Sequence, residues 1–305
     1  MAFSEIIPKL YRINLPIPRG GFESFLDGWL IRDEKRRRTL LVETGPASAV
    51  GELLRQLDSN GVEKIDYLLF THIHLDHSGG AGHFLKAHPE TKATVPAKGR
   101  QHLIDPRKLI EGSRGSLGSL CDLYGEPLPV PEENMLRPEE AIPGLTVIDT
   151  PGHAPHHSSY IYELDGRRLL FAGEAAGCWF PLDGGDFFMR PAAPHKFFYD
   201  TAIASLEKLL ALEDIDLVCF PHSGWLKDGK ELFLRAKEQM KLWLEITSSL
   251  PASADREAAA AALKAGDPML KKLALLPEAV RKREEFFIRQ SANGYLGWLR
   301  RNKTA

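Results

Sequence analysis

The chain has few cysteines, no long apolar run and no excess of charge of either sign. Its 305 residues include three cysteines, Cys121, Cys178 and Cys219, which lie far apart and so exclude a disulfide scaffold. No apolar stretch approaches the roughly 18–20 residues that span a bilayer. With 39 Lys and Arg against 41 Asp and Glu, the formal net charge is −2. This balance argues against dedicated binding of nucleic acid or of an anionic membrane.

The remaining composition is that of a globular protein. Apolar residues make up 43% and charged residues 26% of the chain, which excludes disordered and fibrous classes. Residues 1–10 lack the basic start and apolar stretch of a signal peptide, so with few cysteines we expect a cytoplasmic protein. From Leu232 to Leu250 apolar residues recur at helical spacing. We therefore expect one domain over 1–228 and a C-terminal helical extension over 229–305.

Strand and helix patterns alternate along the first 220 residues. The predicted strands are 28–31, 39–42, 65–70, 94–95, 145–149, 159–164, 168–172 and 217–220. The predicted helices lie between 48 and 60, between 80 and 88, and over 100–111 and 116–123. This order predicts an α/β fold with mixed sheets.

One short segment, Thr71-His72-Ile73-His74-Leu75-Asp76-His77-Ser78-Gly79-Gly80, follows a predicted buried strand and opens a helix. Positions two apart in an extended segment face the same way, so His72 and His74 can converge on one point. Asp76 and His77 come next, at the helix start, and can turn toward a second point. Imidazole and carboxylate suit zinc, and also iron or manganese. Four such groups in six residues indicate a metal site rather than isolated core histidines.

Three more metal-binding side chains follow predicted strands. His153 comes after the strand at 145–149, Glu174 after 168–172, and His222 after 217–220. In open α/β folds, functional groups gather at the carboxyl ends of strands. We therefore expect these residues to join the motif.

The motif H-x-H-x-D-H resembles the signature of the metallo-β-lactamase-fold hydrolases, and the chain is most similar to their glyoxalase II-like and lactonase-like branches. The resemblance implies an αββα sandwich of two mixed sheets with helices outside and a dinuclear metal centre. The first metal would be held by His72, His74 and His153, and the second by Asp76, His77 and His222. Glu174 stands where the family usually has a bridging aspartate, and Glu43 where it has an aspartate that supports the ligands from behind. Both are one methylene longer than the family's residue.

The same resemblance implies a hydrolase that uses a hydroxide held by two divalent ions, with zinc expected and iron or manganese as alternatives. Its substrate would be a thioester, a lactone or a related ester, as in hydroxyacylglutathione hydrolases, and Asp76 would be the catalytic residue that orients the nucleophile and passes on a proton. Two alternatives stay open: a mononuclear iron enzyme like the persulfide dioxygenases, and a phosphodiesterase or nuclease of the same fold. We expect a small-molecule substrate, no nucleic-acid or membrane partner, and leave a homodimer open.

Substrate contacts are predicted in an irregular aromatic stretch after Glu174. Trp179, Phe187 and Phe188 either line a substrate pocket or anchor the C-terminal helices, and His157 is a further candidate contact. The cysteines fit no ligand position and are interpreted as small buried hydrophobes. The basic residues of the C-terminal segment are interpreted as surface residues: Lys271, Lys272, Arg281, Lys282 and Arg283.

Overall fold

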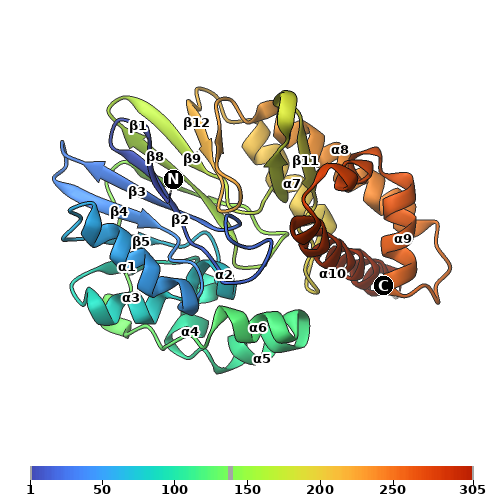
Figure 1. Cartoon of the computed structure of the whole chain (residues 1–305), viewed down its shortest axis with the longest axis horizontal. Coiled ribbons are helices and arrows are strands. Elements are labelled where there is room, and N and C mark those ends of the chain that lie inside the picture. Colours follow the sequence, from blue (N-terminus) through green and yellow to red (C-terminus); the bar gives the residue numbers. More distant parts are fainter. Residues whose placement is uncertain (1, 137–139, 304–305) are drawn as a thin grey trace.

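Two β-sheets lie face to face in the computed structural model, which describes residues 2–136 and 140–303. The first sheet has the order β1-β2-β3-β4-β5-β6, antiparallel through β4 and parallel from β4 to β6. Its strands are β1 (Phe3–Ile7), β2 (Leu10–Asn14), β3 (Asp27–Asp33), β4 (Arg38–Val42), β5 (Tyr67–Leu69) and β6 (Lys92–Thr94). Figure 1 shows this sheet in blue.

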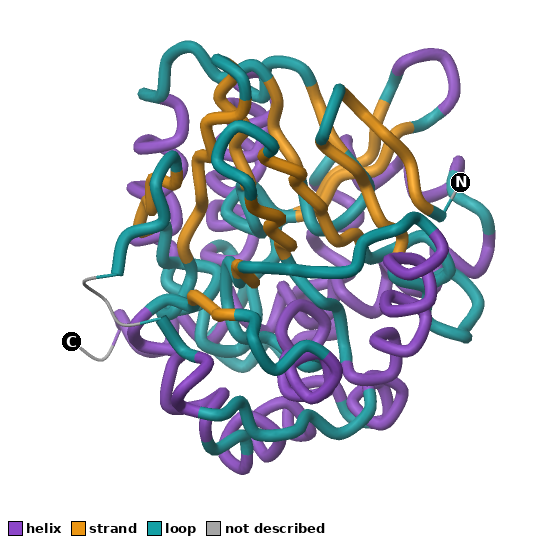
Figure 2. Tube along the Cα trace, turned by 90° about the vertical axis from the view of Figure 1, so that its left-hand side faces the viewer, coloured by secondary structure: helices purple, strands orange, loops and turns teal. Residues whose placement is uncertain are grey.

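The second sheet has the order β13-β12-β9-β8-β7, with a parallel pair only between β12 and β9. Its strands are β7 (Leu145–Asp149), β8 (Ser158–Leu164), β9 (Arg167–Phe171), β12 (Leu217–Cys219) and β13 (Trp225–Leu226). The view in Figure 2 shows the strands gathered above a layer of helices.

Alternating side chains separate two apolar layers. In β3, Trp29 and Ile31 belong to a cluster shared with Tyr160, Leu169 and other residues of the second sheet, whereas Leu30 faces the opposite side. A strand directs successive side chains to opposite faces, so one layer fills the space between the sheets and the other lies beneath the helices.

Helices cover both outer faces, which confirms the predicted αββα sandwich (Figure 1). On the first sheet lie α1 (Val50–Ser59), α2 (Leu75–Ser78), α3 (Ala81–Ala87), α4 (Ala97–Ile104), α5 (Arg107–Leu117) and α6 (Ser119–Tyr124). The single helix predicted over 100–111 is wrong, because the chain breaks at Pro106 between α4 and α5. Proline lacks an N–H and begins a new helix more readily than it continues one.

The C-terminal helices begin on the second sheet and continue beyond it. They are α7 (Tyr199–Leu210), α8 (Lys230–Ser248), α9 (Arg256–Gly266), the 3₁₀ segment η4 (Pro268–Leu275) and α10 (Glu278–Lys303). Side chains of α7 and α8, including Leu206 and Phe233, belong to the same apolar cluster as Leu170 and Val218 of the sheet. None of the helices within 2–136 and 140–303 is long and apolar enough to cross a membrane.

The aromatic stretch after Glu174 was predicted to be irregular, and this is wrong. It forms a hairpin of two strands, β10 (Cys178–Pro181) and β11 (Phe187–Arg190). A buried ion pair joins it to α10, with Arg190 Nε 2.5 Å from Glu284 Oε2. Arg283 Nε also lies 2.7 Å from Glu284 Oε1, so one buried carboxylate serves two guanidinium groups. Arg283 is therefore not the surface residue that was expected.

Buried hydrogen bonds join the two sheets at the edge where β4, β5, β9 and β12 end. The Trp29 indole N–H donates to the Phe220 carbonyl (2.9 Å), and the Tyr160 hydroxyl donates to the Phe70 carbonyl (2.7 Å). The main-chain N–H of Asp27 donates to the Pro221 carbonyl (2.8 Å). These bonds hold the loops of both sheets close together at one edge.

Candidate metal centre

The loop after β5 places the four residues of the motif. It stays extended through His74, whose carbonyl accepts the N–H groups of His77 and Ser78 as α2 begins. The rings of His72 and His74 therefore approach each other, with His72 Nε2 3.0 Å from His74 Nδ1. Asp76 and His77 lie in the only turn of α2, displaced along the edge toward a second position.

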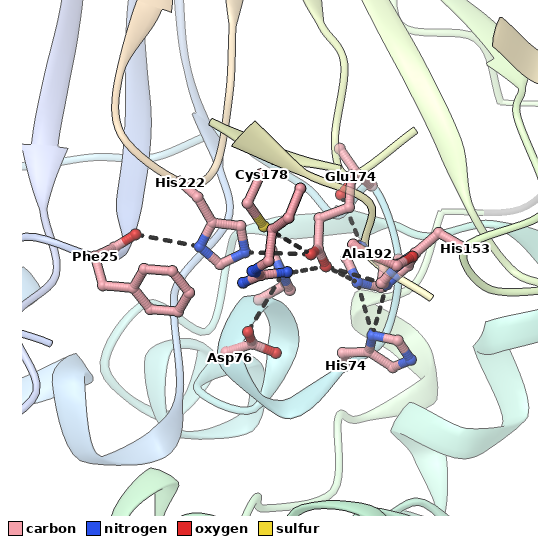
Figure 3. A network of polar contacts seen from close by, with 12 residues as sticks. Phe25, His74, Asp76, His153, Glu174, Cys178, Ala192 and His222 are labelled. Carbon is pink, nitrogen blue, oxygen red and sulfur yellow. Dashed lines mark hydrogen bonds and ion pairs between the residues drawn. The ribbon is translucent and has the colours of Figure 1, made fainter. Parts of the chain in front are cut away.

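The second sheet completes the first group of donors. His153 Nε2 lies 3.0 Å from His74 Nδ1 and 3.0 Å from Glu174 Oε2. Glu174 Oε2 also lies 3.4 Å from His72 Nε2. Figure 3 shows Glu174 and His153 pointing toward His74 from the opposite sheet.

A second group of donors lies on the other side of Glu174. It consists of Asp76, His77 and His222, with His77 Nε2 3.6 Å from Asp76 Oδ2. Glu174 Oε2 is 3.3 Å from His77 Nε2, while Glu174 Oε1 is 3.6 Å from His222 Nε2. The Glu174 carboxylate thus stands between both groups (Figure 3). The structure brings together all seven residues that the sequence predicts as ligands.

Hydrogen bonds from behind orient the imidazoles. His153 Nδ1–H donates to the Ala192 carbonyl (2.9 Å), and His222 Nδ1–H donates to the Phe25 carbonyl (3.1 Å). With its proton on Nδ1, each ring presents the Nε2 lone pair to the centre, as metal-binding histidines do.

Glu43 lies behind both groups, at the end of β4. Its Oε1 accepts the Thr71 hydroxyl (2.6 Å), and Thr71 Oγ1 lies 3.1 Å from His72 Nδ1. Its Oε2 lies 3.9 Å from His77 Nδ1. One carboxylate therefore stands behind a histidine of each group, in the supporting position expected for it.

The electrostatics suit a bound cation. Burial, together with neighbouring imidazoles, lowers the pKa of His72 and His74 well below the usual range, so both rings are neutral. Burial also lowers the pKa of His77, but the carboxylates of Asp76, Glu174 and Glu43 outweigh it and raise the value to about 9. The pKa of Glu174 is held well below its usual range because surrounding imidazoles overcome the effect of burial.

Unpaired buried atoms give an independent test of whether a metal fits. Both ring nitrogens of His77 are buried and lack a hydrogen-bond partner, as does Glu43 Oε2. Buried polar groups are rarely left unpaired, because each costs roughly 1–3 kcal/mol. Five imidazoles and two carboxylates converging here form a donor set that fits divalent metals.

His157 lies beneath Glu174 rather than at the mouth of the centre. The main-chain N–H of Glu174 donates to His157 Nε2 (3.0 Å), so His157 Nδ1 carries the proton and donates to Thr150 Oγ1 (2.9 Å). Thr150 Oγ1–H then donates to Ser159 Oγ (2.9 Å), and Ser159 donates to the Ala172 carbonyl (3.0 Å). We call this arrangement the His157 chain. It positions Glu174, and the expected substrate contact of His157 has no support in this geometry.

Gly173 makes room for that chain. It has a φ of +57°, and a Cβ at this position would lie 2.3 Å from His157 Nε2. Only glycine adopts this conformation without strain and leaves space for the ring.

The three aromatic candidates lie on the hairpin at the interface with other elements. Trp179 is buried with its ring edge against Phe220, and Phe188 is fully buried beside Phe180. Phe187 is half-buried beneath the cations of Arg235 and Lys272. The contacts of Phe187 with Arg235 of α8 and Lys272 of η4 match the anchoring alternative. A role in substrate binding stays a prediction for all three residues.

Cys178 lies at the centre but was not among the predicted site residues. Its Sγ lies 3.4 Å from Glu174 Oε1, and together with Glu174 and His222 it forms a third group of converging donors. The only signal in the sequence is that Cys178 follows Glu174 by four residues, with Gly177 between them. This spacing predicts a contact only once the turn over residues 174–177 is known.

Comparisons with known proteins agree with this site. Residues 27–222 match the family described as the metallo-beta-lactamase superfamily. The chain is 30% identical over 224 residues to a hydroxyacylglutathione hydrolase of Albidiferax ferrireducens, which covers 71% of this chain and 68% of that protein. It is 26% identical over 201 residues to a metallo-beta-lactamase fold-containing protein of Sulfurisphaera tokodaii, covering 61% and 69%. Sequence and donor geometry thus define a metal-binding αββα sandwich, and this chain belongs to the metallo-beta-lactamase superfamily of hydrolases.

Solved structures show the same fold. A metallo-beta-lactamase family protein of Thermus thermophilus superposes with a TM-score of 0.64 at 21% identity, covering 98% of this chain and 95% of that one. The match includes the C-terminal helices, so the extension beyond the sandwich is shared with that structure. Identity at this level shows the fold alone.

Proposed function

We propose that this protein hydrolyses a thioester or a related ester, lactones included, with two divalent metals at the centre. The observation that carries this proposal is the Glu174 carboxylate, which lies between two donor groups: Oε2 is 3.4 Å from His72, 3.0 Å from His153 and 3.3 Å from His77, and Oε1 is 3.6 Å from His222. A relative at 30% identity is a hydroxyacylglutathione hydrolase, and a hydroxyacyl group on the glutathione thiol is a thioester.

Divalent metals bound here would supply a water of lowered pKa and would polarise a substrate carbonyl. The protein's own contribution is to hold the donors rigidly and to leave one side accessible. His72, His77, His153 and His222 are buried, whereas the Asp76 side chain is 15% exposed. Asp76 is therefore the carboxylate that can hold a proton on the solvent side of the centre and return it to the leaving group.

The second donor group favours this function over a mononuclear iron oxygenase. One metal would need only His72, His74 and His153 with Glu174, yet Asp76, His77 and His222 form another group on the far side of Glu174. In a two-metal hydrolytic site one ion can activate the attacking water while the other polarises the substrate carbonyl, and this requires donors on both sides.

The basic residues of the C-terminal segment give little support for glutathione as the thiol carrier. Lys272 Nζ lies 2.6 Å from Asp186, and Lys282 Nζ 2.5 Å from Glu278. Arg283 is buried against Glu284. Three of the five candidates thus form contacts within the protein. We therefore propose the type of bond that is hydrolysed and do not assign the thiol part of the substrate.

The test is a panel of an acylglutathione thioester, a simple alkyl thioester, a lactone and a phosphodiester, assayed with zinc-reconstituted protein. We expect the highest kcat/KM for a thioester. In His74→Ala we expect that activity to be lost and the bound metal, measured by elemental analysis, to fall with it. Faster cleavage of the phosphodiester than of either thioester or the lactone would overturn the proposal. The exposed variant Glu278→Gln, far from the donors in the sequence, serves as a control that keeps full activity.

A further inference from the structure

We infer that Cys178 is a metal ligand at the second position, beside Asp76, His77 and His222, and that it gives this position a preference for zinc. The inference rests on the metal centre of the proposed function but not on its substrate. The motif H-x-H-x-D-H contains no cysteine, and the resemblance to the family assigns none at this place in the chain.

The first support is distance and burial. Cys178 Sγ lies 3.4 Å from Glu174 Oε1, the oxygen that faces His222, and the ligand atoms of these three residues all lie within 4.8 Å of one another. All three side chains are buried. In Figure 3 the sulfur of Cys178 points toward the Glu174 carboxylate, which His222 also faces.

The second support is that the chain is shaped to place this sulfur. The main-chain N–H of Gly177 donates to the Glu174 carbonyl (3.0 Å), so residues 174–177 form a tight turn that returns Cys178 to the Glu174 side chain. Gly177 has a φ of +79°, and a Cβ there would lie 2.2 Å from the Arg190 carbonyl. The turn therefore requires glycine, and the register of the hairpin pairs Cys178 with Arg190.

The surroundings of the sulfur differ from those of the other two cysteines. Arg190, the strand partner of Cys178, carries a buried guanidinium held by Glu284. Cys219 lies in the apolar cluster between the sheets, and Cys121 and Cys178 belong to the cluster under the helices, but Cys178 also contacts the Glu174 carboxylate. Within the described residues, the donor groups include Cys178 and neither of the others.

The position beside Cys178 contains donors that no hydrogen bond occupies. His77 Nε2 is buried and makes no hydrogen bond, although Glu174 Oε2 lies 3.3 Å from it, and His222 Nε2 is 3.6 Å from Glu174 Oε1, longer than a hydrogen bond. On binding, the sulfur–hydrogen bond breaks, a sulfur–metal bond forms and the proton leaves to solvent, with no change of oxidation state. A thiolate among two imidazoles and a carboxylate is a softer donor set than manganese or magnesium prefers, and it suits zinc.

Cobalt(II) as a spectroscopic substitute for zinc tests this directly. Full-length protein is stripped with chelator and loaded with Co²⁺, whose visible bands report any bound cobalt and whose near-ultraviolet charge-transfer band reports a thiolate ligand. We expect both bands in the wild type. Visible bands without the near-ultraviolet band would overturn the inference and leave the metal centre intact, whereas no cobalt bands at all would overturn the metal centre itself.

Variants assign the sulfur. Cys178→Ser should abolish the near-ultraviolet band and keep the visible bands, while Cys219→Ser and Cys121→Ser should keep both. Zinc-versus-manganese competition should show a preference reduced at least about tenfold in Cys178→Ser, the lower end of the cost of losing a residue that supports a metal. An unchanged preference, or a near-ultraviolet band that persists in Cys178→Ser, would overturn the assignment. The wild-type spectrum decides the matter even where a variant fails to fold.

Discussion

The two sheets contribute to the centre in different ways. The first sheet supplies His72, His74, Asp76 and His77 from one continuous loop whose conformation is set by the start of α2. The second supplies His153, Glu174 and His222 from three loops separated along the chain by about 20 to 50 residues. The continuous side depends on local geometry, whereas the dispersed side depends on buried contacts that hold each loop in place. Substitutions behind the dispersed side should therefore affect the centre from a distance.

The largest effect is expected at Glu174, where the two sides meet. Glu174→Ala removes the carboxylate that contacts His72 and His77 of one sheet and His153 and His222 of the other. We expect metal content to fall at both positions and activity to fall at least about 100-fold, the upper range for residues that merely support a ligand. Elemental analysis and kcat/KM measure both.

Glu174→Asp is the matched control, since it keeps the charge and shortens the reach by one methylene. It should retain part of the metal and part of the activity. Two metals still bound in Glu174→Ala would mean that this carboxylate does not join the two groups.

Next in size is the buried ion cluster behind the hairpin of the dispersed side. Glu284→Gln leaves the guanidinium groups of Arg190 and Arg283 buried without their carboxylate. Removing one partner of a buried ion pair costs about 3–5 kcal/mol of the free energy of unfolding. Chemical denaturation followed by circular dichroism measures the loss.

Glu278→Gln on the same helix breaks only an exposed pair with Lys282 and should leave the free energy of unfolding nearly unchanged. Equal losses in the two variants would show that burial of the cluster adds nothing.

A smaller effect is expected at Asp27, whose segment holds the His222 loop. Burial is the main reason that its pKa is raised, to about 6, despite Arg12 Nε at 2.8 Å. A raised carboxyl pKa adds stability at low pH that is lost as pH rises from about 4 through 6. Relative to Asp27→Asn, the wild type should lose up to about 3 kcal/mol over that window, since one pKa unit equals about 1.36 kcal/mol.

Denaturation midpoints of both proteins at several pH values between 4 and 7 measure this difference. A constant difference between the two proteins across that range would contradict a raised pKa for Asp27.

The smallest effect is expected from His157, which supports Glu174 from behind. His157→Leu leaves the Glu174 N–H without its acceptor and removes the bond that the Thr150 hydroxyl accepts from the ring. Metal affinity, measured by competition with a chelator, should weaken about 10–100-fold. Ser159→Ala interrupts the His157 chain farther from Glu174 and should weaken metal affinity less. An unchanged metal affinity in His157→Leu would show that the His157 chain has no role at the centre.

The continuous side of the centre could be predicted from the sequence, and the dispersed side only in part. His72, His74, Asp76 and His77 lie within six residues, so their spacing alone places them together. The places of His153, Glu174 and His222 after predicted strands suggested that they join the site, but their assignment to the two metal positions needed the family resemblance. Cys178 could not be predicted, because its approach to Glu174 depends on the turn at Gly177 and on pairing with Arg190.

The same distinction applies to the fold. Strand and helix order followed from apolar patterns, and the family resemblance added the sandwich. The hairpin at 178–190 was missed because its aromatic side chains are buried against helices distant in the sequence. The burial of Arg283 was missed for a similar reason. A guanidinium is buried at low cost only where a carboxylate such as Glu284 pairs with it, and the sequence does not show that pairing.

The His157 chain has one further consequence, which concerns its direction. Because a main-chain amide donates to His157 Nε2, every later donor in the chain points toward the Ala172 carbonyl. Burial lowers the pKa of the His157 ring to about 3, so the ring stays uncharged at any pH a cell maintains. The main-chain N–H of Glu174 therefore sets the donor-to-acceptor direction of the whole His157 chain. No side-chain substitution at Glu174 can reverse that direction, because the donor is a main-chain group. A change of pH in the cell also leaves the His157 chain in one protonation state.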